Sequence, residues 1–279
     1  MNTPTRVMPS QVTCQLLTEI NDGTKAIKIL RNPNYAAQQK FDGKRIILEI
    51  ARTNVTAYNR KGLACSVSPE IIQEARRLAP LAPLTLDGEW IREVKSFQAF
   101  DLLELCGQNT TELAFKVRQG HLFNTLNFTS FQTIKAARTE YEEDRKIALL
   151  QQVHAANLEG VVLKPITAPY RIRRELDHYK LKFTAVSSFL IIKRNDKESV
   201  AIGLYDDAGR LIPCGDVKIR NDRFKLTEGM IIDVRYLYAF PQSQRVFQPR
   251  MEKIRDDLQS ENCTVSQLRY KGTKTAIII

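Results

Sequence analysis

The sequence lacks the hydrophobic segments by which proteins enter or cross membranes. Over its 279 residues, no stretch approaches the roughly 20 apolar residues of a membrane-spanning helix. The N-terminus has no basic run followed by an apolar core, which is the pattern of a signal peptide. These absences predict a soluble, intracellular protein, which would be cytoplasmic if its source is prokaryotic or viral.

Cysteine and histidine are sparse and are not arranged as metal sites or disulfides. The five cysteines are widely spread, odd in number and without C-x-x-C spacing, so we expect reduced thiols in packed positions. The three histidines, His121, His154 and His178, form no pattern of metal ligands. The sequence therefore predicts neither a disulfide framework nor a structural zinc site.

A phosphate-binding P-loop is also absent, because the pattern G-x-x-x-x-G-K-[ST] does not occur. If the protein uses ATP, side-chain cations must hold the phosphates instead. Cations are plentiful, since 42 Lys and Arg residues against 31 Asp and Glu residues give a formal net charge of +11. This charge predicts a polyanionic partner, and nothing in the sequence favours a membrane surface over nucleic acid.

The chain is richest in potential chemistry at Lys40-Phe41-Asp42-Gly43-Lys44-Arg45. This K-x-D-G-x-R motif places an amine nucleophile near a carboxylate, a glycine and a fixed cation. A lysine with the reference pKa of about 10.4 is neutral roughly one time in a thousand at about pH 7.4, so a reactive lysine needs neighbouring cations or a metal to lower its pKa. Alone, the motif also fits a polar hairpin turn with Gly43 at positive φ.

Further motifs follow in a fixed order. They are Asn59-Arg60-Lys61-Gly62, Leu86-Asp87-Gly88-Glu89, Ala99-Phe100-Asp101-Leu102-Leu103-Glu104, Glu159-Gly160-Val161-Val162-Leu163-Lys164-Pro165 and Tyr179-Lys180-Leu181-Lys182. With the first motif, this set resembles motifs I, Ia, III, IIIa, IV and V of the ATP-dependent polynucleotide (DNA) ligases, a branch of the covalent nucleotidyltransferase superfamily. The resemblance extends from about Tyr35 to about Leu258.

By this resemblance, the reacting groups lie in the first and last motifs of the set. Lys40 corresponds to the nucleophile that attacks the α-phosphate of ATP, expels pyrophosphate and becomes linked to AMP. Lys180 and Lys182 match the catalytic pair that neutralises the α-phosphate, and alternate residues of a strand point to one face. A K-x-K pair is also common on solvent-facing strands.

Two glutamates match carboxylates that the family uses around a metal. Glu159 corresponds to the residue that helps to hold a divalent cation, and Glu89 to one that reads the ribose or assists the metal. Mg²⁺ is the expected ion because it prefers oxygen ligands and bridges phosphates through one or two carboxylates, and Mn²⁺ can substitute. Asp42 is expected to be a site residue, either for the metal or for hydrogen bonding.

Three other residues match nucleotide and nucleic-acid contacts. Phe100 corresponds to the aromatic residue that stacks on adenine, although a phenylalanine in an apolar strand usually belongs to the core. Arg45 and Arg60 correspond to arginines that contact the AMP phosphate and the 5′-phosphate at the break, and guanidinium binds phosphate in a bidentate manner. Arg60 lies in a short, degenerate motif and could be an ordinary surface residue.

The segment 247–258 resembles motif VI, the barrel element that orients the pyrophosphate leaving group. Arg255 and Asp257 match the pattern, so Arg255 is expected to act in catalysis. The chain departs from the family at Leu258, which stands where a lysine is usual. Lys253 and Arg250 are both candidates to replace that cation.

The resemblance implies an α+β protein of two domains. Residues 1–183 would form a nucleotidyltransferase (ATP-grasp-like adenylation) domain of antiparallel sheets and helices, with a helix at Gln15–Ile20 followed by a polar loop at Asn21–Gly23. Residues 184–279 contain five short strand-like runs separated by turn signals, which favours a β-barrel of the oligonucleotide-binding (OB) type. Composition alone would equally fit another small β-domain.

The function implied is that of an ATP-dependent DNA ligase that seals nicks with 3′-hydroxyl and 5′-phosphate ends. ATP and Mg²⁺ would be its cofactors, nicked duplex DNA its partner, and a monomer its expected state. An RNA ligase, or an enzyme sealing RNA-containing hybrids, shares the lysine chemistry and stays open. A non-catalytic nucleic-acid-binding protein that keeps the fold is a further alternative, although it would not need the nucleophile.

Overall fold

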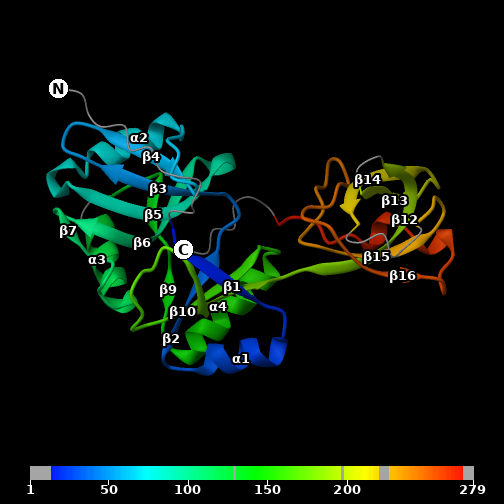
Figure 1. The fold of residues 1–279 in the computed structure, drawn as a ribbon, viewed down its shortest axis with the longest axis horizontal. Coiled ribbons are helices and arrows are strands. Elements are labelled where there is room, and N and C mark those ends of the chain that lie inside the picture. The colour runs from blue at the N-terminus through cyan, green and yellow to red at the C-terminus, as the bar shows by residue number, and fades with distance from the viewer. Residues whose placement is uncertain (1–13, 128–129, 196–197, 220–225, 273–279) are drawn as a thin grey trace. The chain divides into compact units, whose positions relative to one another are not determined.

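The structure is a computed structural model that describes residues 14–127, 130–195, 198–219 and 226–272 (Figure 1). The chain divides into two compact units at the junction between Lys182 and Phe183. The first unit combines two sheets with the α-helices, and the second is built on one sheet. The expected α+β fold class, antiparallel sheets and helices followed by a smaller β-barrel unit, is confirmed.

The first unit contains two mainly antiparallel sheets. One has the order β1 (Leu16–Ile20), β11 (Arg174–Lys182), β10 (Gly160–Pro165), β2 (Tyr35–Lys40) and β9 (Thr139–Glu140). The other has the order β4 (Val55–Asn59), β3 (Lys44–Ile50), β5 (Leu84–Ile91), β6 (Ser96–Leu105) and β7 (Gln108–Asn109), with β8 (Ile134–Ala136) beside β6. Only the pairs β1/β11 and β6/β8 are parallel within these two sheets.

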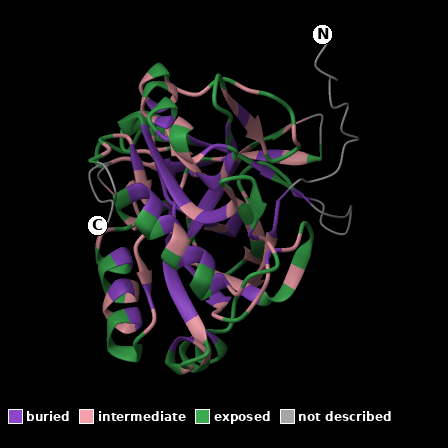
Figure 2. Cartoon of the chain, turned by 90° about the vertical axis from the view of Figure 1, so that its left-hand side faces the viewer, coloured by how far each residue is buried: buried purple, intermediate pink, exposed green. Residues whose placement is uncertain are grey.

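Four α-helices accompany these sheets: α1 (Gly23–Arg31), α2 (Pro69–Arg76), α3 (Phe115–Asn127) and α4 (Glu143–Ala155). Short 3₁₀ turns occur at Ala79–Leu81, Arg92–Val94, Ser260–Asn262 and Val265–Gln267. Figure 2 shows the strands of the first unit largely buried and the helices exposing their outer faces. Ile46, Leu48, Phe97 and Leu122 belong to a core of buried side chains that β3, β6 and α3 share.

One expectation near the N-terminus is wrong. Gln15–Ile20 was expected to be helical, but Leu16–Ile20 forms β1 because its backbone pairs in parallel with β11. The expected polar loop comprises Asn21 and Asp22, and α1 begins at Gly23, where the Asp22 carboxylate accepts hydrogen bonds from two backbone amides of the first turn. Helix α3 was not expected from the sequence.

The sheet of the second unit has the order β14 (Leu211–Lys218), β13 (Ser199–Tyr205), β12 (Ala185–Asn195), β15 (Ile231–Tyr236) and β16 (Arg250–Arg255), with all neighbours antiparallel. Val246, which precedes β16, donates a backbone hydrogen bond to Cys214 of β14, 2.9 Å away. The two edges of the sheet are thereby drawn together around a core that includes Phe189, Ile202 and Val234. This curvature is that of a small barrel.

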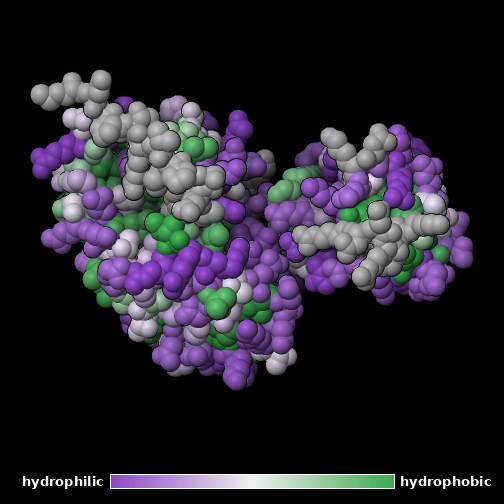
Figure 3. All heavy atoms as spheres, viewed as in Figure 1, coloured by the Kyte–Doolittle hydropathy of each residue, from purple (hydrophilic) through white to green (hydrophobic). Residues whose placement is uncertain are grey.

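Hydrophilic residues cover much of the surface of each unit in Figure 3. Among the described residues, every helix is too short or too polar to cross a membrane. The cysteines are unpaired, as expected, but Cys106 is exposed rather than packed.

Candidate active site

Lys40 lies at the end of β2, where strand register places it beside a buried carboxylate. Lys40 pairs with Gly160 in the antiparallel ladder of β2 and β10, so the preceding residue, Glu159, is its neighbour. The Lys40 Nζ lies 2.8 Å from Glu159 Oε2. The sequence-predicted nucleophile and metal carboxylate, 119 positions apart in the numbering, therefore meet in one ion pair.

Gly160 allows a third strand to join them. It has φ +152°, and a Cβ there would lie 1.9 Å from the Leu181 carbonyl oxygen of β11. Only glycine permits this approach. The approach sets Lys182 opposite Gly160, and the Lys182 Nζ lies 3.4 Å from Glu159 Oε1. One carboxylate is thus shared by two lysines.

Lys180 is close to this pair, but it has a partner of its own. Its Nζ lies 3.2 Å from Glu19 Oε2, because Glu19 of β1 is directly opposite Lys180 in the parallel ladder. Burial lowers the pKa of Lys180, Glu19 opposes that effect, and the neighbouring charges of Lys182 and Lys40 add to it. Glu19 was not anticipated from the sequence, because the segment around it was expected to be helical.

Glu89 on β5 faces the same cluster from the other sheet. Burial raises the pKa of Glu89 to about 7, with the Glu159 carboxylate also raising it and Lys40 and Arg45 opposing. The two predicted metal carboxylates are therefore near enough to interact. Their oxygen atoms fit the preference of Mg²⁺, which binds proteins through one or two carboxylates and keeps several waters.

Gly43 follows the nucleophile for a reason other than turn geometry. It does not have the positive φ that the hairpin interpretation required. A Cβ at Gly43 would lie 2.4 Å from the Trp90 carbonyl oxygen, so glycine lets the start of β3 approach the end of β5. This contact holds Lys40 and Glu89 on neighbouring segments.

Arg45 is already engaged in a bidentate ion pair. Its Nε and Nη2 donate to the two oxygens of Asp87, each at 2.5 Å, and Asp87 also accepts from the Tyr170 hydroxyl at 2.6 Å. The guanidinium carbon lies 4.6 Å from the centre of the Phe100 ring. Arg45 is thus held in a fixed position beside the predicted adenine-stacking residue.

Phe100 has a second cation beside its ring. Lys164 Nζ lies 5.1 Å from the Phe100 ring centre and 3.6 Å from the Asp101 carboxylate. Burial lowers the pKa of Lys164 to about 8. No role was expected for Lys164, although it belongs to the motif Glu159–Pro165, because the sequence does not show that this lysine is buried.

A cavity of about 60 Å³ brings these groups together. Its lining includes Gln38, Lys40, Arg45, Glu89, Phe100, Val162 and Lys164. Phe100 is therefore only partly a core residue, because its ring borders the cavity. Arg60 and the pair Lys180 and Lys182 do not line it.

Arg60 lies in the exposed turn after β4, where Asn59 accepts a hydrogen bond from the Lys61 amide. Its charge acts on the buried Cys14 thiol together with that of Arg45, which places it on the same side of the unit. Asp42 is half-buried between β2 and β3.

The expectation that no histidine lies in a group of possible metal ligands needs correction for His178. His178 forms a cluster with Glu175 and Asp177 of β11 whose potential ligand atoms lie within 4.8 Å of one another. His178 Nδ1 lies 2.8 Å from Asp177, and Glu175 accepts from Arg173 at 2.7 Å. The members of this cluster are thus bonded within the protein.

In the second unit, Arg255 stands between two carboxylates. Its Nη2 lies 2.6 Å from Asp257 and its Nη1 3.2 Å from Asp233. The two cations proposed to replace the missing lysine, Lys253 and Arg250, are both exposed on β16, and the Lys253 Nζ lies 3.7 Å from the Asp233 carboxylate. Leu258 packs against the core of the barrel.

No protein-family model matches the sequence, and a search of curated proteins found no match either. Solved structures do match. Mycobacterial DNA ligase D, complexed with ATP and MES, is 19% identical over 93% of this chain and 98% of that chain, with a TM-score of 0.54. A structure from a study of DNA binding by Lig E DNA ligases is 17% identical over 87% and 98%, with a TM-score of 0.65.

A third structure, described as Pmar-Lig_Pre, is 16% identical over 88% of this chain and 68% of that chain, with a TM-score of 0.69. At such identities the comparison concerns fold rather than activity. The chain has the fold of the DNA ligases, a nucleotidyltransferase unit followed by an OB-fold.

Proposed function

We propose that this protein is an ATP-dependent DNA ligase that seals nicks carrying 3′-hydroxyl and 5′-phosphate ends. The observation that carries the proposal is the shared carboxylate, in which Lys40 and Lys182 contact the two oxygens of Glu159 beside the cavity that contains Phe100. A binding protein would have no use for an amine held at that position. The fold and the net charge of +11 support the same function.

In the first step, the Lys40 amine attacks the α-phosphate of ATP, a P–N bond forms, and pyrophosphate leaves. Lys182 and Lys180 match the charge that develops on the phosphoryl oxygens. Phe100 and Val162, which both line the cavity, hold the base between them. A divalent cation bound by Glu159 and Glu89 would neutralise phosphate charge and withdraw the Glu159 carboxylate from Lys40, which favours the neutral, attacking amine.

In the next two steps, AMP passes from Lys40 to the 5′-phosphate of the broken strand, and the 3′-hydroxyl then displaces AMP to seal the backbone. Arg45 and Arg60 bind phosphates of AMP and of the break. The first unit thus acts as the adenylation domain, and the second as the nucleic-acid-binding OB domain. Nicked duplex DNA is the proposed substrate because the structural neighbours are DNA ligases by name.

The test uses the full chain with ATP labelled at the α-phosphate and Mg²⁺, followed by nicked DNA, nicked RNA and a nicked hybrid. A covalent protein-AMP adduct that disappears when nicked DNA is added, with sealed DNA as product, is the expected result. Adduct formation with sealing of RNA alone would replace DNA by RNA as substrate. Nucleic-acid binding without any adduct would identify a binding protein and overturn the proposal.

A further inference from the structure

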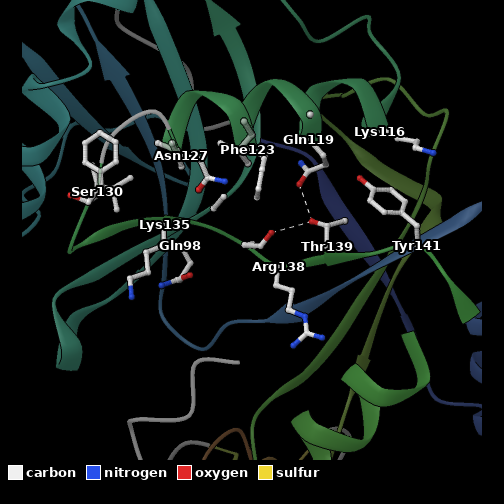
Figure 4. A pocket seen from close by; sticks show the side chains of 17 residues that line it. Gln98, Lys116, Gln119, Phe123, Asn127, Ser130, Lys135, Arg138, Thr139 and Tyr141 are labelled. Carbon is white, nitrogen blue, oxygen red and sulfur yellow. Dashed lines mark hydrogen bonds between the residues drawn. The ribbon is translucent and has the colours of Figure 1, made fainter. Parts of the chain in front are cut away.

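A large hollow lies between helix α3 and the segment that carries β8 and β9. Its volume is about 840 Å³, against about 60 Å³ for the nucleotide cavity, and the two have no lining residue in common among those described. Figure 4 shows Phe123 and Asn127 extending from the helix toward the segment that carries Lys135 and Arg138. This hollow, the α3 groove, is therefore separate from the site of the proposed chemistry.

The floor of the α3 groove is apolar. Leu122 and Leu126 of α3 and Ile134 of β8 line it, and each is at most 5% exposed. Phe123 of α3 also lines the groove, but it is 59% exposed. A large aromatic side chain that borders an apolar hollow and yet contacts water is typical of a binding surface rather than of a core.

The charged residues that line the α3 groove are all positive. They are Lys116, Lys135 and Arg138, and no aspartate or glutamate is among the described lining residues. Arg138 lies 2.5 Å from the Glu140 carboxylate. The amines of Lys116 and Lys135 form no ion pair within the part of the chain that the structure describes. The groove therefore complements an anionic ligand.

A single-stranded nucleic acid is one anionic ligand to consider, and it binds by stacking successive bases on exposed aromatic faces. Two of the three aromatic rings in the groove already have a cation beside them. The Phe131 ring centre lies 4.9 Å from the Arg77 guanidinium. The Tyr141 ring centre lies 5.3 Å from the Lys116 amine. The groove thus offers a strand no series of free stacking faces.

An acidic polypeptide segment fits the groove better. Amphipathic helices bind proteins by laying their apolar face into a hydrophobic groove. The apolar side chains of such a segment would pack against Phe123 and Leu126, and its carboxylates would pair with Lys135 and Lys116. Both the apolar floor and the unpaired ammonium groups are then used.

We propose that the α3 groove is a docking surface for an acidic amphipathic segment of a partner protein. The partner would hold the first unit by α3 and leave the nucleotide cavity open, because the two sites are lined by different residues. This interaction is additional to the proposed function and does not require that the protein react with ATP.

The test measures the binding of a labelled model peptide to the full chain by fluorescence anisotropy. The peptide has about 14 residues, or about four helical turns, with leucine along one face and glutamate along the other. We expect saturable binding. Two control peptides should bind at least about tenfold more weakly, one with lysine in place of glutamate and one with the same residues in scrambled order.

Variants locate the peptide on the protein. Phe123→Ser should weaken binding of the acidic peptide by about tenfold or more, because it removes an aromatic contact of the hot-spot kind. Lys135→Glu should weaken it by about tenfold at low salt and by less at high salt, because the interaction is electrostatic. Val117→Ser, at an exposed position of α3 outside the groove, and Lys28→Glu, on α1, are the matched controls and should bind the peptide as wild type does.

Several results would overturn the proposal, and all of them leave the proposed function intact. Absence of binding, or equal binding of the acidic and the lysine peptide, would show that the groove does not select an acidic segment. Unchanged affinity in both Phe123→Ser and Lys135→Glu would place the peptide elsewhere on the protein. Displacement of the peptide by single-stranded oligothymidylate, with the affinity for the oligonucleotide itself reduced in Phe123→Ser, would make the groove a nucleic-acid site instead.

Discussion

The cations of the two units are neutralised to different degrees, although both sets were predicted to meet phosphate. In the first unit, Lys40 and Lys182 both contact the buried Glu159 carboxylate. In the second unit, Arg255 contacts both Asp233 and Asp257. Two cations thus contact one carboxylate in the first unit, whereas one cation contacts two carboxylates in the second.

This difference suggests how each cluster meets its ligand. Partly buried cations that share one carboxylate attract an anion into a site that is already formed. Arg255 would have to exchange a carboxylate for a phosphate, so its interaction with pyrophosphate depends on a competing ion pair within its own unit.

The largest effect is expected at the nucleophile. Lys40→Ala should abolish the covalent adduct with AMP, because the variant loses the amine that contacts Glu159 at 2.8 Å and that matches the nucleophile of the K-x-D-G-x-R motif. Lys40→Arg should fail equally, since guanidinium stays protonated and cannot attack. Gel detection of label from ATP checks both. Label retained by the Lys40→Ala protein would assign the nucleophile to another residue.

Excess positive charge should also make nick binding depend steeply on salt. If about six phosphates are neutralised, affinity should fall by about 10³-fold between about 50 and 200 mM salt, because condensed counterions are released on binding. Fluorescence anisotropy with a labelled nicked duplex measures this slope. A nearly flat response would show that the charge of +11 is not gathered into a phosphate-binding surface.

Arg255→Ala should lower adenylylation from ATP by about 10²-fold, which is typical for loss of one group that stabilises a transition-state charge. Pyrophosphate leaves only in the first step, so the variant should seal a nick that already carries AMP at close to the wild-type rate. Lys182→Ala and Glu159→Ala serve as comparisons. Both should be defective in adenylylation from ATP and also in sealing a nick that already carries AMP. Equal defects of Arg255→Ala on both would make Arg255 a nucleic-acid-binding or structural residue.

Glu89 should make the stability of the free protein depend on pH. Its pKa is raised from 4.5 to about 7, so the folded state binds this proton more tightly than the unfolded state. That contribution is fully present below about pH 4.5 and is lost as pH rises through about 7. Glu89→Gln stays neutral, and its stability relative to wild type should improve by about 2 kcal/mol from pH 5 to pH 8.

Urea unfolding at both pH values, without metal or nucleotide, provides the measurement. Glu104→Gln, the same substitution at a half-buried glutamate that accepts a hydrogen bond from Thr85, is the control. Parallel stability profiles for Glu89→Gln and wild type would mean that the Glu89 carboxylate is not buried as described.

Local sequence patterns and the order of the motifs predicted most of the strands that carry the site and most of the site residues. The strands that carry Lys40, Glu89 and Lys182 were expected, and the structure brings Lys40, Glu89, Glu159 and Lys182 into one cluster. The prediction failed where pairing between distant segments decides the conformation. Leu16–Ile20 has helix-compatible spacing, but its parallel partner β11 lies more than 150 positions further along the chain.

The sequence also did not predict which carboxylates form ion pairs with the expected cations. Asp87 was noted only as a member of the motif Leu86–Glu89, and its bidentate ion pair with Arg45 was not expected. Glu19 pairs with Lys180 only because β1 is a strand. Gln119 accepts a hydrogen bond from Gln38 and donates one to the Phe100 carbonyl, residues 81 and 19 positions away, and no sequence spacing reveals these contacts.

The smallest expected effect concerns the competing ion pair itself. Asp257 is 60% exposed, and exposed ion pairs contribute little to stability, so Asp257→Asn should leave the melting temperature essentially unchanged. Its effect should instead appear in adenylylation at subsaturating ATP, where Arg255 is released from one of its two carboxylates. We expect a gain of about two- to fivefold at low salt that vanishes at high salt, because the competing Coulomb interaction is screened. Asp256→Asn, which removes the neighbouring negative charge, controls for the change in net charge. A loss of adenylylation in Asp257→Asn, without a loss in the control, would show that Asp257 positions Arg255 for pyrophosphate rather than competing for it.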